Sequence, residues 1–407
     1  MNDDVSNSWP TIILVYCLSL AAAMVVSEGV PALGGIAAEL HPRSPAMIGW
    51  VMSIPALVVA LGGLATGWLV DKAGDRRMLL VGGVAVLIGD GGAIASSAIA
   101  PLLAWRVVAG IGYAFMAVAS VTMLMRITIG RTRVAALALW STVIPASFIC
   151  AFALGALVAA FGWRWVFGAH AVIVGVLATI GVAALPAHRA GEPAISRTSG
   201  LLTVLRSPRV HALGISFAVA AFLQSGMIAV LAKLLAIRVG ASEAQVNSFG
   251  IVVMLFNMGG ALAVGALLNR RVPAWIIGAA GAALAGAGTL ILATAVGDFA
   301  TAIIVDCVLM LGCGLLAGMW ALLPRVAPSP QTMGATSGLV TQITLIGVLF
   351  GAPSAFAALG MGATGFLLIV VVMLLGTAAA VPVWLRPLSA GPATVGDAAP
   401  ALRQAVH

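Results

Sequence analysis

Five charged residues of this 407-residue sequence stand inside long apolar segments, where a charge is costly. They are Glu28, Asp90, Arg106, Lys233 and Asp306. On insertion scales, a charged side chain at the centre of a bilayer costs about 3 kcal/mol, so each of them needs a partner or a wet cavity. Carboxylates in such a place exchange protons when water reaches them, and the cations pair with carboxylates or with an anionic ligand.

The surrounding composition is that of a membrane protein. Hydrophobic residues make up 62% of the sequence and charged residues 8%, with a mean hydropathy of +1.15. Soluble domains are about one half apolar and about one quarter charged, so this composition excludes an ordinary soluble protein. The apolar residues come in blocks of about 20, the length of a helix that crosses about 30 Å of hydrocarbon. The net charge of +8 is spread over short clusters, which argues against a nucleic-acid-binding face.

The hydropathy pattern predicts an all-α integral membrane protein with twelve spans. Their expected residues are 11–33, 46–70, 78–99, 101–125, 134–160, 164–186, 210–237, 245–268, 273–296, 299–323, 333–358 and 361–385. A polar stretch at 187–209 divides the spans into a first six-helix bundle over 1–186 and a second over 210–386. The tail at 387–407 is rich in Ala, Pro and Gly and is expected to be disordered.

The basic residues determine the expected orientation of the spans. Of the twenty Lys and Arg residues, only Arg43, Arg164 and Arg238 fall in turns on the side of the membrane opposite the N-terminus. The positive-inside rule therefore predicts that both termini and the linker at 187–209 lie in the cytoplasm. We expect a multi-pass protein of the inner (plasma) membrane.

The two halves of the sequence resemble each other. Residues 46–72 align with residues 244–270. The alignment pairs Gly67 with Gly265, Asp71 with Asn269 and Lys72 with Arg270. Further along, a slightly larger offset pairs the Gly-x-Gly that starts at Gly110 with the one that starts at Gly312. A duplicated six-span unit explains both matches, and such internal repeats are typical of secondary transporter folds.

The densest charge of the sequence lies in a turn, GWLVDKAGDRR, between the second and third spans. The residues that we expect to form a gating motif here are Gly67, Asp71, Lys72, Gly74, Arg76 and Arg77. Gly74 can take positive φ, and Gly67 lets neighbouring helices approach closely. Asp71 can accept hydrogen bonds from the free N–H groups of a nearby helix start, while the two arginines pair with Asp71 or hold lipid phosphates. The alternative is that all these charges only anchor the turn at the interface.

This turn resembles the loop 2–3 signature of the major facilitator superfamily, G-x-x-x-D-[RK]-x-G-[RK]-[RK]. The segment GALLNRR (265–271), at the end of the eighth span and in the turn that follows, is similar to the degenerate second copy of that signature. In the fourth span, RVVAGIG (106–112) resembles the family's R-x-x-x-G-x-G pattern, whose arginine is linked to proton coupling. FGWRWVF (161–167) is similar to the drug:proton antiporter branch of the family, and Pro145 is the part of that branch's span 5 signature that this sequence keeps.

The resemblance implies two pseudo-symmetric six-helix bundles, the major facilitator fold, that open alternately to the two sides of the membrane. It implies that spans 1, 4, 7 and 10 line the central cavity. It also implies that the charged turn is a latch, which joins the two halves while the cytoplasmic side is closed and breaks when that side opens.

Four of the five charges within the spans fall on those that the resemblance assigns to the cavity. Glu28 is the expected proton carrier, and Arg106 is expected to promote proton release from Glu28 or to bind an anionic substrate group. Asp306 and Lys233 are expected to face this pair from the second half. Asp90 is expected to pack between helices, with a proton relay as the alternative.

Each cavity charge also has a plainer interpretation. For Glu28 and Arg106 it is a static buried ion pair. Lys233 would be a lysine whose ammonium group reaches the interface, and Asp306 would be a polar residue in the outer leaflet.

With the resemblance, the sequence predicts a secondary transporter that exports a small organic molecule in exchange for protons. The alternative is an uptake carrier for a small organic anion, either proton-coupled or a uniporter. A membrane enzyme or sensor is less favoured, because neither H-E-x-x-H nor a phosphate-binding glycine loop occurs in the sequence. His170 is expected to be a satisfied polar group. The expected partners are the substrate, protons and the lipid bilayer; we expect a monomer with no nucleic acid, cofactor or metal.

Overall fold

The computed structural model describes residues 8–42, 46–186 and 197–385. Over these three ranges the chain forms helices joined by short turns, with no strand. Eleven helical segments of this part are long and apolar enough to cross a membrane, and Ala363–Ala378 is a shorter apolar helix. Together they correspond in order to the twelve expected spans. The expected disordered tail at 387–407 lies outside the described residues, as do residues 187–196 of the expected linker.

The first half of the chain supplies eight helical segments for six spans. They are α1 (Trp9–Ser27), α2 (Gly29–Leu40), α3 (Ala46–Ala73), α4 (Asp75–Ala95), α5 (Ile99–Ile127), α6 (Gly130–Trp140), α7 (Val143–Phe161) and α8 (Arg164–Ala184). The first and fifth spans are each made of two segments, because a proline interrupts each of them. Proline has no N–H for the carbonyl four residues earlier, which for Pro31 is Ser27 and for Pro145 is Ser141. The helices break at those positions, and Glu28 stands at the first break.

The second half follows a short helix in the linker, and its irregular span is the tenth. The segments are α9 (Arg197–Leu205), α10 (Pro208–Val239), α11 (Glu243–Asn269), α12 (Ala274–Thr294), α13 (Phe299–Gly318), η1 (Met319–Leu322), α14 (Leu323–Val326), η2 (Pro330–Thr332), α15 (Met333–Met361), α16 (Ala363–Ala378) and α17 (Val381–Trp384). The linker at 187–209 is thus partly helical. We did not predict α9, whose Val204 is buried and whose residues pack against α15. The tenth span consists of α13, η1 and α14.

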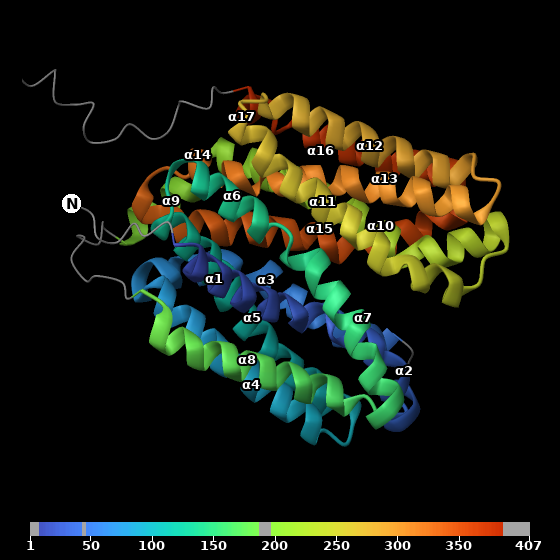
Figure 1. Ribbon diagram of the computed structural model, residues 1–407, viewed down its shortest axis with the longest axis horizontal. Helices are drawn as coiled ribbons and strands as arrows, with labels where there is room; N and C mark the ends of the chain where they lie inside the picture. The colour runs from blue at the N-terminus through green and yellow to red at the C-terminus, as the bar shows by residue number, and fades with distance from the viewer. Residues whose placement is uncertain (1–7, 43–45, 187–196, 386–407) are drawn as a thin grey trace, which may run out of the picture.

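The helices are arranged as two bundles (Figure 1). Helices α1–α8, coloured blue to green, form one bundle, and α10–α17, coloured yellow to red, form the other. The bundles meet where α3 packs against α15 and where α6 and α7 pack against α11. We call the end of the molecule that carries the α3–α4 turn, α9 and the start of α15 the basic end.

Glycines allow the two bundles to approach closely near the basic end. A Cβ atom on Gly67 of α3 would lie 2.8 Å from the carbonyl carbon of Gly334 and 2.9 Å from the Cα atom of Ala335. On the other side of the interface, a Cβ atom on Gly265 of α11 would lie 2.7 Å from the Cβ atom of Ala138. Small residues at both crossings let the helix backbones touch. The sequence repeat aligns these same two glycines.

The structure corrects one detail of the repeat. A Cβ atom on Gly112 of α5 would meet the carbonyl oxygen of Gly82 at 2.6 Å, and one on Gly312 of α13 would meet that of Gly281 at 2.7 Å. Gly112 therefore corresponds to Gly312, and the pairing of Gly110 with Gly312 is wrong. The two Gly-x-Gly segments look alike in sequence, but the contact with the neighbouring helix determines the register.

Candidate functional site

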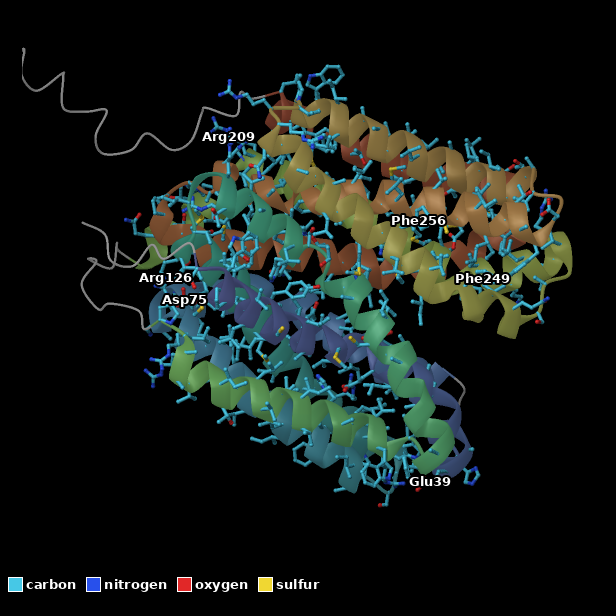
Figure 2. All side chains as sticks on the ribbon, viewed as in Figure 1. Glu39, Asp75, Arg126, Arg209, Phe249 and Phe256 are labelled. Atoms are coloured by element: carbon cyan, nitrogen blue, oxygen red, sulfur yellow. The ribbon has the colours of Figure 1, made fainter. Side chains whose placement is uncertain are left out.

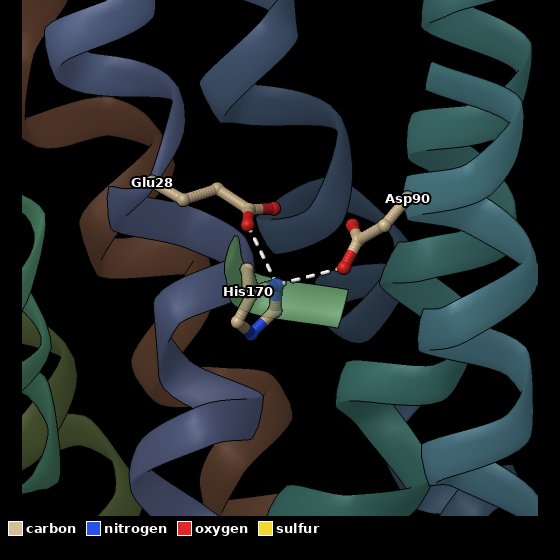
Figure 3. Close-up of side chains that lie close together, drawn as sticks. All are labelled: Glu28, Asp90 and His170. Carbon is tan, nitrogen blue, oxygen red and sulfur yellow. Dashed lines mark ion pairs between the residues drawn. The ribbon is translucent and has the colours of Figure 1, made fainter. Parts of the chain in front are cut away.

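Four ionisable side chains meet inside the first bundle, and all four are fully buried. Glu28 comes from the break between α1 and α2, Asp90 from α4, Arg106 from α5 and His170 from α8. Figure 3 shows both carboxylates pointing toward the His170 ring. We call these four residues the buried cluster. Burial of four ionisable groups is costly unless they satisfy one another, so their mutual geometry decides what the cluster can do.

Arg106 is held by three oxygen acceptors. Its Nη1 donates to Glu28 Oε1 at 2.5 Å, its Nε donates to the carbonyl of Val51 at 3.0 Å, and its Nη2 donates to the carbonyl of Val25. Both carbonyls are free for a local reason. Val25 lies in the last turn of α1, where carbonyls lack a partner within the helix, and Pro55 has no N–H to offer to Val51. The end of α1 and the proline inside α3 thus provide the acceptors that orient the guanidinium.

His170 lies between the two carboxylates. Its Nδ1 is 2.6 Å from Glu28 Oε2 and 2.8 Å from Asp90 Oδ2. Its Nε2 is 2.7 Å from the carbonyl oxygen of Ala21. The second ion-pair distance of Arg106, from Nη1 to Asp90 Oδ1, is 4.0 Å. The imidazole therefore links an acid on the first span to an acid on the third, with the arginine close to both.

The cluster is chemically suited to protons. Two carboxylates and one imidazole can each take up or release a proton, whereas Arg106 stays charged. Glu28, Asp90 and His170 also lie close enough together to surround a metal ion. Arg106 disfavours that use, because its Nη1 is already 2.5 Å from Glu28 and would repel a second cation. A proton fits the site better than a metal.

The structure brings together three of the five predicted site residues. Glu28, Arg106 and Asp90 belong to the buried cluster, whereas Lys233 and Asp306 do not. Lys233 is exposed on α10, and the ion pairs of the described residues do not include it. Asp306 is fully buried on α13, where neither carboxylate oxygen has a hydrogen-bond partner within the described ranges. No hydrogen bond or ion pair of the described residues joins either of them to the Glu28–Arg106 pair, and α13 packs mainly against α11 and α12 of its own bundle. That the two residues face this pair stays a prediction.

His170 is the residue of the cluster that the sequence analysis missed. We expected it to be a satisfied polar group, but its Nδ1 lies between two acids. A signal for this position was present in the sequence. Asp90, Arg106 and His170 all stand within about two helical turns of the same end of their spans, so they share one depth in the membrane. Similar depth on different spans of one bundle favours contact.

The charged turn forms a second site, at the basic end. Asp71 Oδ1 accepts the N–H of Gly334 and Asp71 Oδ2 accepts the N–H of Ala335, each at 2.7 Å. These are free N–H groups of the first turn of α15, where the helix dipole also favours a negative charge. Close by, the backbone N–H of Leu64 donates to Gln342 Oε1 at 2.9 Å. Hydrogen bonds of α3 thus join the two bundles.

The other charges of the turn stay within the first bundle. Asp75 accepts two hydrogen bonds from Arg126, at 2.7 and 3.0 Å, and Figure 2 shows the two residues together at the basic end. Arg76 donates to the carbonyl of Val182 at 2.6 Å, and Lys72 lies over the ring of Trp68. Among the described residues neither Arg76 nor Arg77 forms an ion pair with Asp71, so of the two expected roles the contact with lipid phosphates stays a prediction. The N–H groups of α15 satisfy Asp71 instead.

Gly74 permits the turn itself. Its φ is +91°, a conformation that side chains with a Cβ rarely adopt. The repeat provides a matching contact in the second half, where Asn269 Nδ2 donates across the interface to the carbonyl of Arg131 at 3.4 Å. Asp71 and Asn269, which the sequence repeat aligns, thus each bind backbone at the start of a helix in the opposite bundle.

Comparisons with known proteins agree with this arrangement. The family model described as Major Facilitator Superfamily matches residues 12–352. The fold is similar to the crystal structure of the human organic anion transporter MFSD10 (TETRAN), with a TM-score of 0.77 and 15% sequence identity over 91% of this chain and 98% of that one.

One relative in sequence is the uncharacterized MFS-type transporter Rv1250 of Mycobacterium tuberculosis. It is 31% identical over 189 residues, which are 45% of this chain and 32% of that protein. The match thus spans about a third of the relative's length. The family model, by contrast, covers most of this chain and agrees with the two helical bundles. The chain therefore belongs to the major facilitator superfamily and is a multi-pass membrane transporter, not an enzyme.

Proposed function

We propose that this transporter exports a small organic molecule in exchange for protons, by alternating access. The observation that carries the proposal is the buried cluster of Glu28, Asp90, Arg106 and His170. Three protonatable groups held at low dielectric against one permanent cation form a site that gains and loses protons as water reaches it. A purely structural role would need only one acid to neutralise Arg106.

The basic end is the proposed cytoplasmic gate. Its basic residues support a cytoplasmic position for it and for both termini, by the positive-inside rule. The bonds from Asp71 to α15 and from Leu64 to Gln342 would hold this side closed in the present conformation. Their rupture would open it as the bundles over 1–186 and 210–386, which the segment 187–209 connects in sequence, rock about a central cavity. We place the protein in the inner (plasma) membrane as a monomer.

The organic-anion alternative is less well supported. It requires Arg106 to present free N–H groups to a substrate carboxylate. Instead three of the five N–H groups of Arg106, one each on Nε, Nη1 and Nη2, donate to protein oxygens, and the whole side chain is buried. Lys233, the second candidate for holding an anion, lies apart from the cluster. A small organic molecule with no required negative charge is the better proposal.

A flux assay tests the direction of coupling. A substrate is first found by growing cells with and without the gene against a panel of toxic compounds and carbon sources. Purified protein in proteoliposomes is then given a pH gradient of either sign. Antiport predicts that the substrate accumulates in vesicles with an acidic interior, because protons leave as substrate enters. Accumulation in vesicles with an alkaline interior would show symport, and flux indifferent to the gradient would show uniport.

The matched variants are Glu28→Gln and Glu39→Gln. Both remove one carboxylate, but Glu28 belongs to the buried cluster and Glu39 lies at the opposite end of the molecule from the basic end, with half of its side chain exposed. Glu28→Gln should abolish gradient-driven accumulation, and Glu39→Gln should retain it. Gradient-driven accumulation by Glu28→Gln at the wild-type level would remove the support for this proposal.

A further inference from the structure

The carbonyl of Ala21 determines which nitrogen of His170 exchanges a proton. A carbonyl oxygen can only accept a hydrogen bond, so the contact of 2.7 Å with Nε2 requires a hydrogen on Nε2. Nδ1 is then the nitrogen with a variable proton. Figure 3 shows that this side of the ring faces the two acids.

The position of Nδ1 requires that His170, Glu28 and Asp90 together hold at least one proton. With no proton, its lone pair would lie 2.6 and 2.8 Å from two negatively charged oxygens, which repel it. A proton on Nδ1 turns both contacts into attractions. Asp90 is the partner that needs it more, because neither of its oxygens makes a hydrogen bond in the described part of the chain, whereas Glu28 already binds Arg106.

Charge balance sets the number of protons at one. Glu28 and Asp90 contribute two negative charges and Arg106 one positive charge, so a neutral His170 leaves the cluster at minus one. One proton makes the cluster neutral, and a second would make it plus one. A net charge in a buried site is costly, so the closed site favours the single-proton state. Within the described ranges, no other charged side chain forms an ion pair with His170.

We propose that His170 Nδ1 carries the transported proton, one per cycle, between water and the Glu28–Asp90 pair. This inference rests on the proposed function and names the group that does the coupling. On uptake, a proton from water bonds to the Nδ1 lone pair. On release, the N–H bond breaks, the electron pair stays on Nδ1, and the proton returns to water directly or through an oxygen of Asp90. Arg106 keeps Glu28 ionised throughout, which makes it a positioning residue.

The first test separates coupling from transport. In His170→Asn, an amide keeps a hydrogen-bonding side chain but cannot titrate. We expect substrate counterflow without a pH gradient to persist, while accumulation driven by the gradient is lost. The matched control is His211→Asn, a histidine that also contacts a backbone carbonyl, that of Leu205, but lies on α10 outside the cluster. His211→Asn should accumulate substrate in response to the pH gradient as the wild type does. Full gradient-driven accumulation by His170→Asn would overturn the inference while leaving the proposed function standing.

The second test reads the proton directly and does not depend on a substrate. The full-length protein, labelled with 15N-histidine, is titrated by NMR, and the His170 signals are assigned as those missing from His170→Asn. We expect Nε2 to stay protonated while Nδ1 changes with pH, and Asp90→Asn to shift that titration. The inference would be overturned if the hydrogen were on Nδ1 and Nε2 were unprotonated. It would also be overturned if the ring did not titrate at all.

The third test counts protons in the wild-type protein. The substrate gradient that just balances an imposed pH gradient gives the ratio of protons to substrate, and we expect one. A ratio of two would contradict the single-proton state. Flux that follows a sodium gradient in place of the pH gradient would show that a metal cation takes the proton's place, and would contradict both this inference and the proposed function.

Discussion

Trp140 and Trp320 meet edge to face across the two bundles, with their ring centroids 5.0 Å apart. Phe217 stacks on Trp320 at 4.9 Å, and all three rings are buried. Trp140 ends α6 at the helix break before Pro145, and Trp320 lies in η1, so each ring stands where its span departs from a regular α-helix. The rings form an aromatic contact between the bundles in addition to the hydrogen bonds of the basic end.

Removing this contact should destabilise the protein. Truncating a large buried aromatic costs about 3–5 kcal/mol in well-packed cores, so Trp320→Ala should lower the melting temperature in detergent clearly. Trp320→Phe keeps a ring and should lower it less. The control is Trp165→Ala, because Trp165 is largely exposed. Equal melting temperatures for Trp320→Ala and Trp165→Ala would contradict an aromatic contact that holds the bundles together.

The close approach of α3 to α15 should not tolerate a methyl group. In Gly67→Ala the new Cβ would overlap the backbone of Gly334, so we expect the closed basic end to be disfavoured and transport to fall strongly. Gly62→Ala is the matched control on the same helix, because nothing lies within 4 Å of its Cβ position. Substrate flux measures both. Wild-type flux through Gly67→Ala would contradict a close approach of α3 to α15 that leaves no room for a methyl group.

The bonds of Asp71 should matter more than the charge of the turn. Asp71→Ala removes two hydrogen bonds between the bundles, each contributing about 0.5–1.5 kcal/mol, so the closed state should lose stability and flux should fall. Arg77→Ala removes a charge from the same turn at an exposed position and should leave flux near the wild-type level. Similar losses in both variants would instead favour simple anchoring of the turn at the interface.

Arg106 and Glu28 should be strongly coupled in stability. Removing one partner of a buried ion pair costs about 3–5 kcal/mol, because the other charge remains buried and unpaired. We expect Arg106→Ala to lower the melting temperature more than the double variant Arg106→Ala with Glu28→Gln. Additive effects of the two changes would contradict the pairing. Arg106→Lys should also fail to transport, because a lysine lacks the planar fork that reaches Val51 and Val25.

The ion pair between Arg164 and Glu39, at the end opposite the basic end, should make the stability of the protein depend on pH in the acid range. Arg164 donates to both oxygens of Glu39, at 2.6 and 2.8 Å, and this hydrogen bonding, with that from Trp163, lowers the pKa of Glu39. A lowered folded-state pKa adds stability above the ordinary glutamate pKa, and that stability is lost as pH falls through the folded value. The melting temperature of Glu39→Gln should therefore fall less than that of the wild type between about pH 6 and pH 3. Parallel curves of melting temperature against pH for Glu39→Gln and the wild type would contradict a lowered pKa of Glu39 in the folded protein.

The sequence predicted the elements better than the partners of individual charges. Apolar blocks determine spans because the bilayer thickness sets helix length, so the twelve segments could be read directly. Free N–H groups at a helix start attract an anion, so an acceptor role for Asp71 was also predictable, although the choice of α15 was not. The partner depends on which helix of the other bundle passes the turn, and spacing along the chain does not contain that information.

The buried cluster shows the same limit. Glu28, Arg106 and Asp90 could be singled out because charge within a span is costly, but the rotation of each helix about its axis decides which charges meet. That rotation brought His170 into the cluster and left Lys233 and Asp306 out of it. The carbonyls that hold Arg106 depend on the helix break near Pro31 and on Pro55 inside α3. Both prolines are visible in the sequence, but the carbonyls that accept from Arg106 are visible only in three dimensions.

Proton release on substrate binding tests the central claim most directly. Antiport requires that substrate and proton occupy the transporter alternately, so substrate added to purified protein in weakly buffered solution should release protons, approaching one per transporter molecule. The same addition to Glu28→Gln or His170→Asn should release none. Proton uptake on binding, or binding by the wild type with no proton movement at any pH, would contradict the claim that the buried cluster couples export to protons.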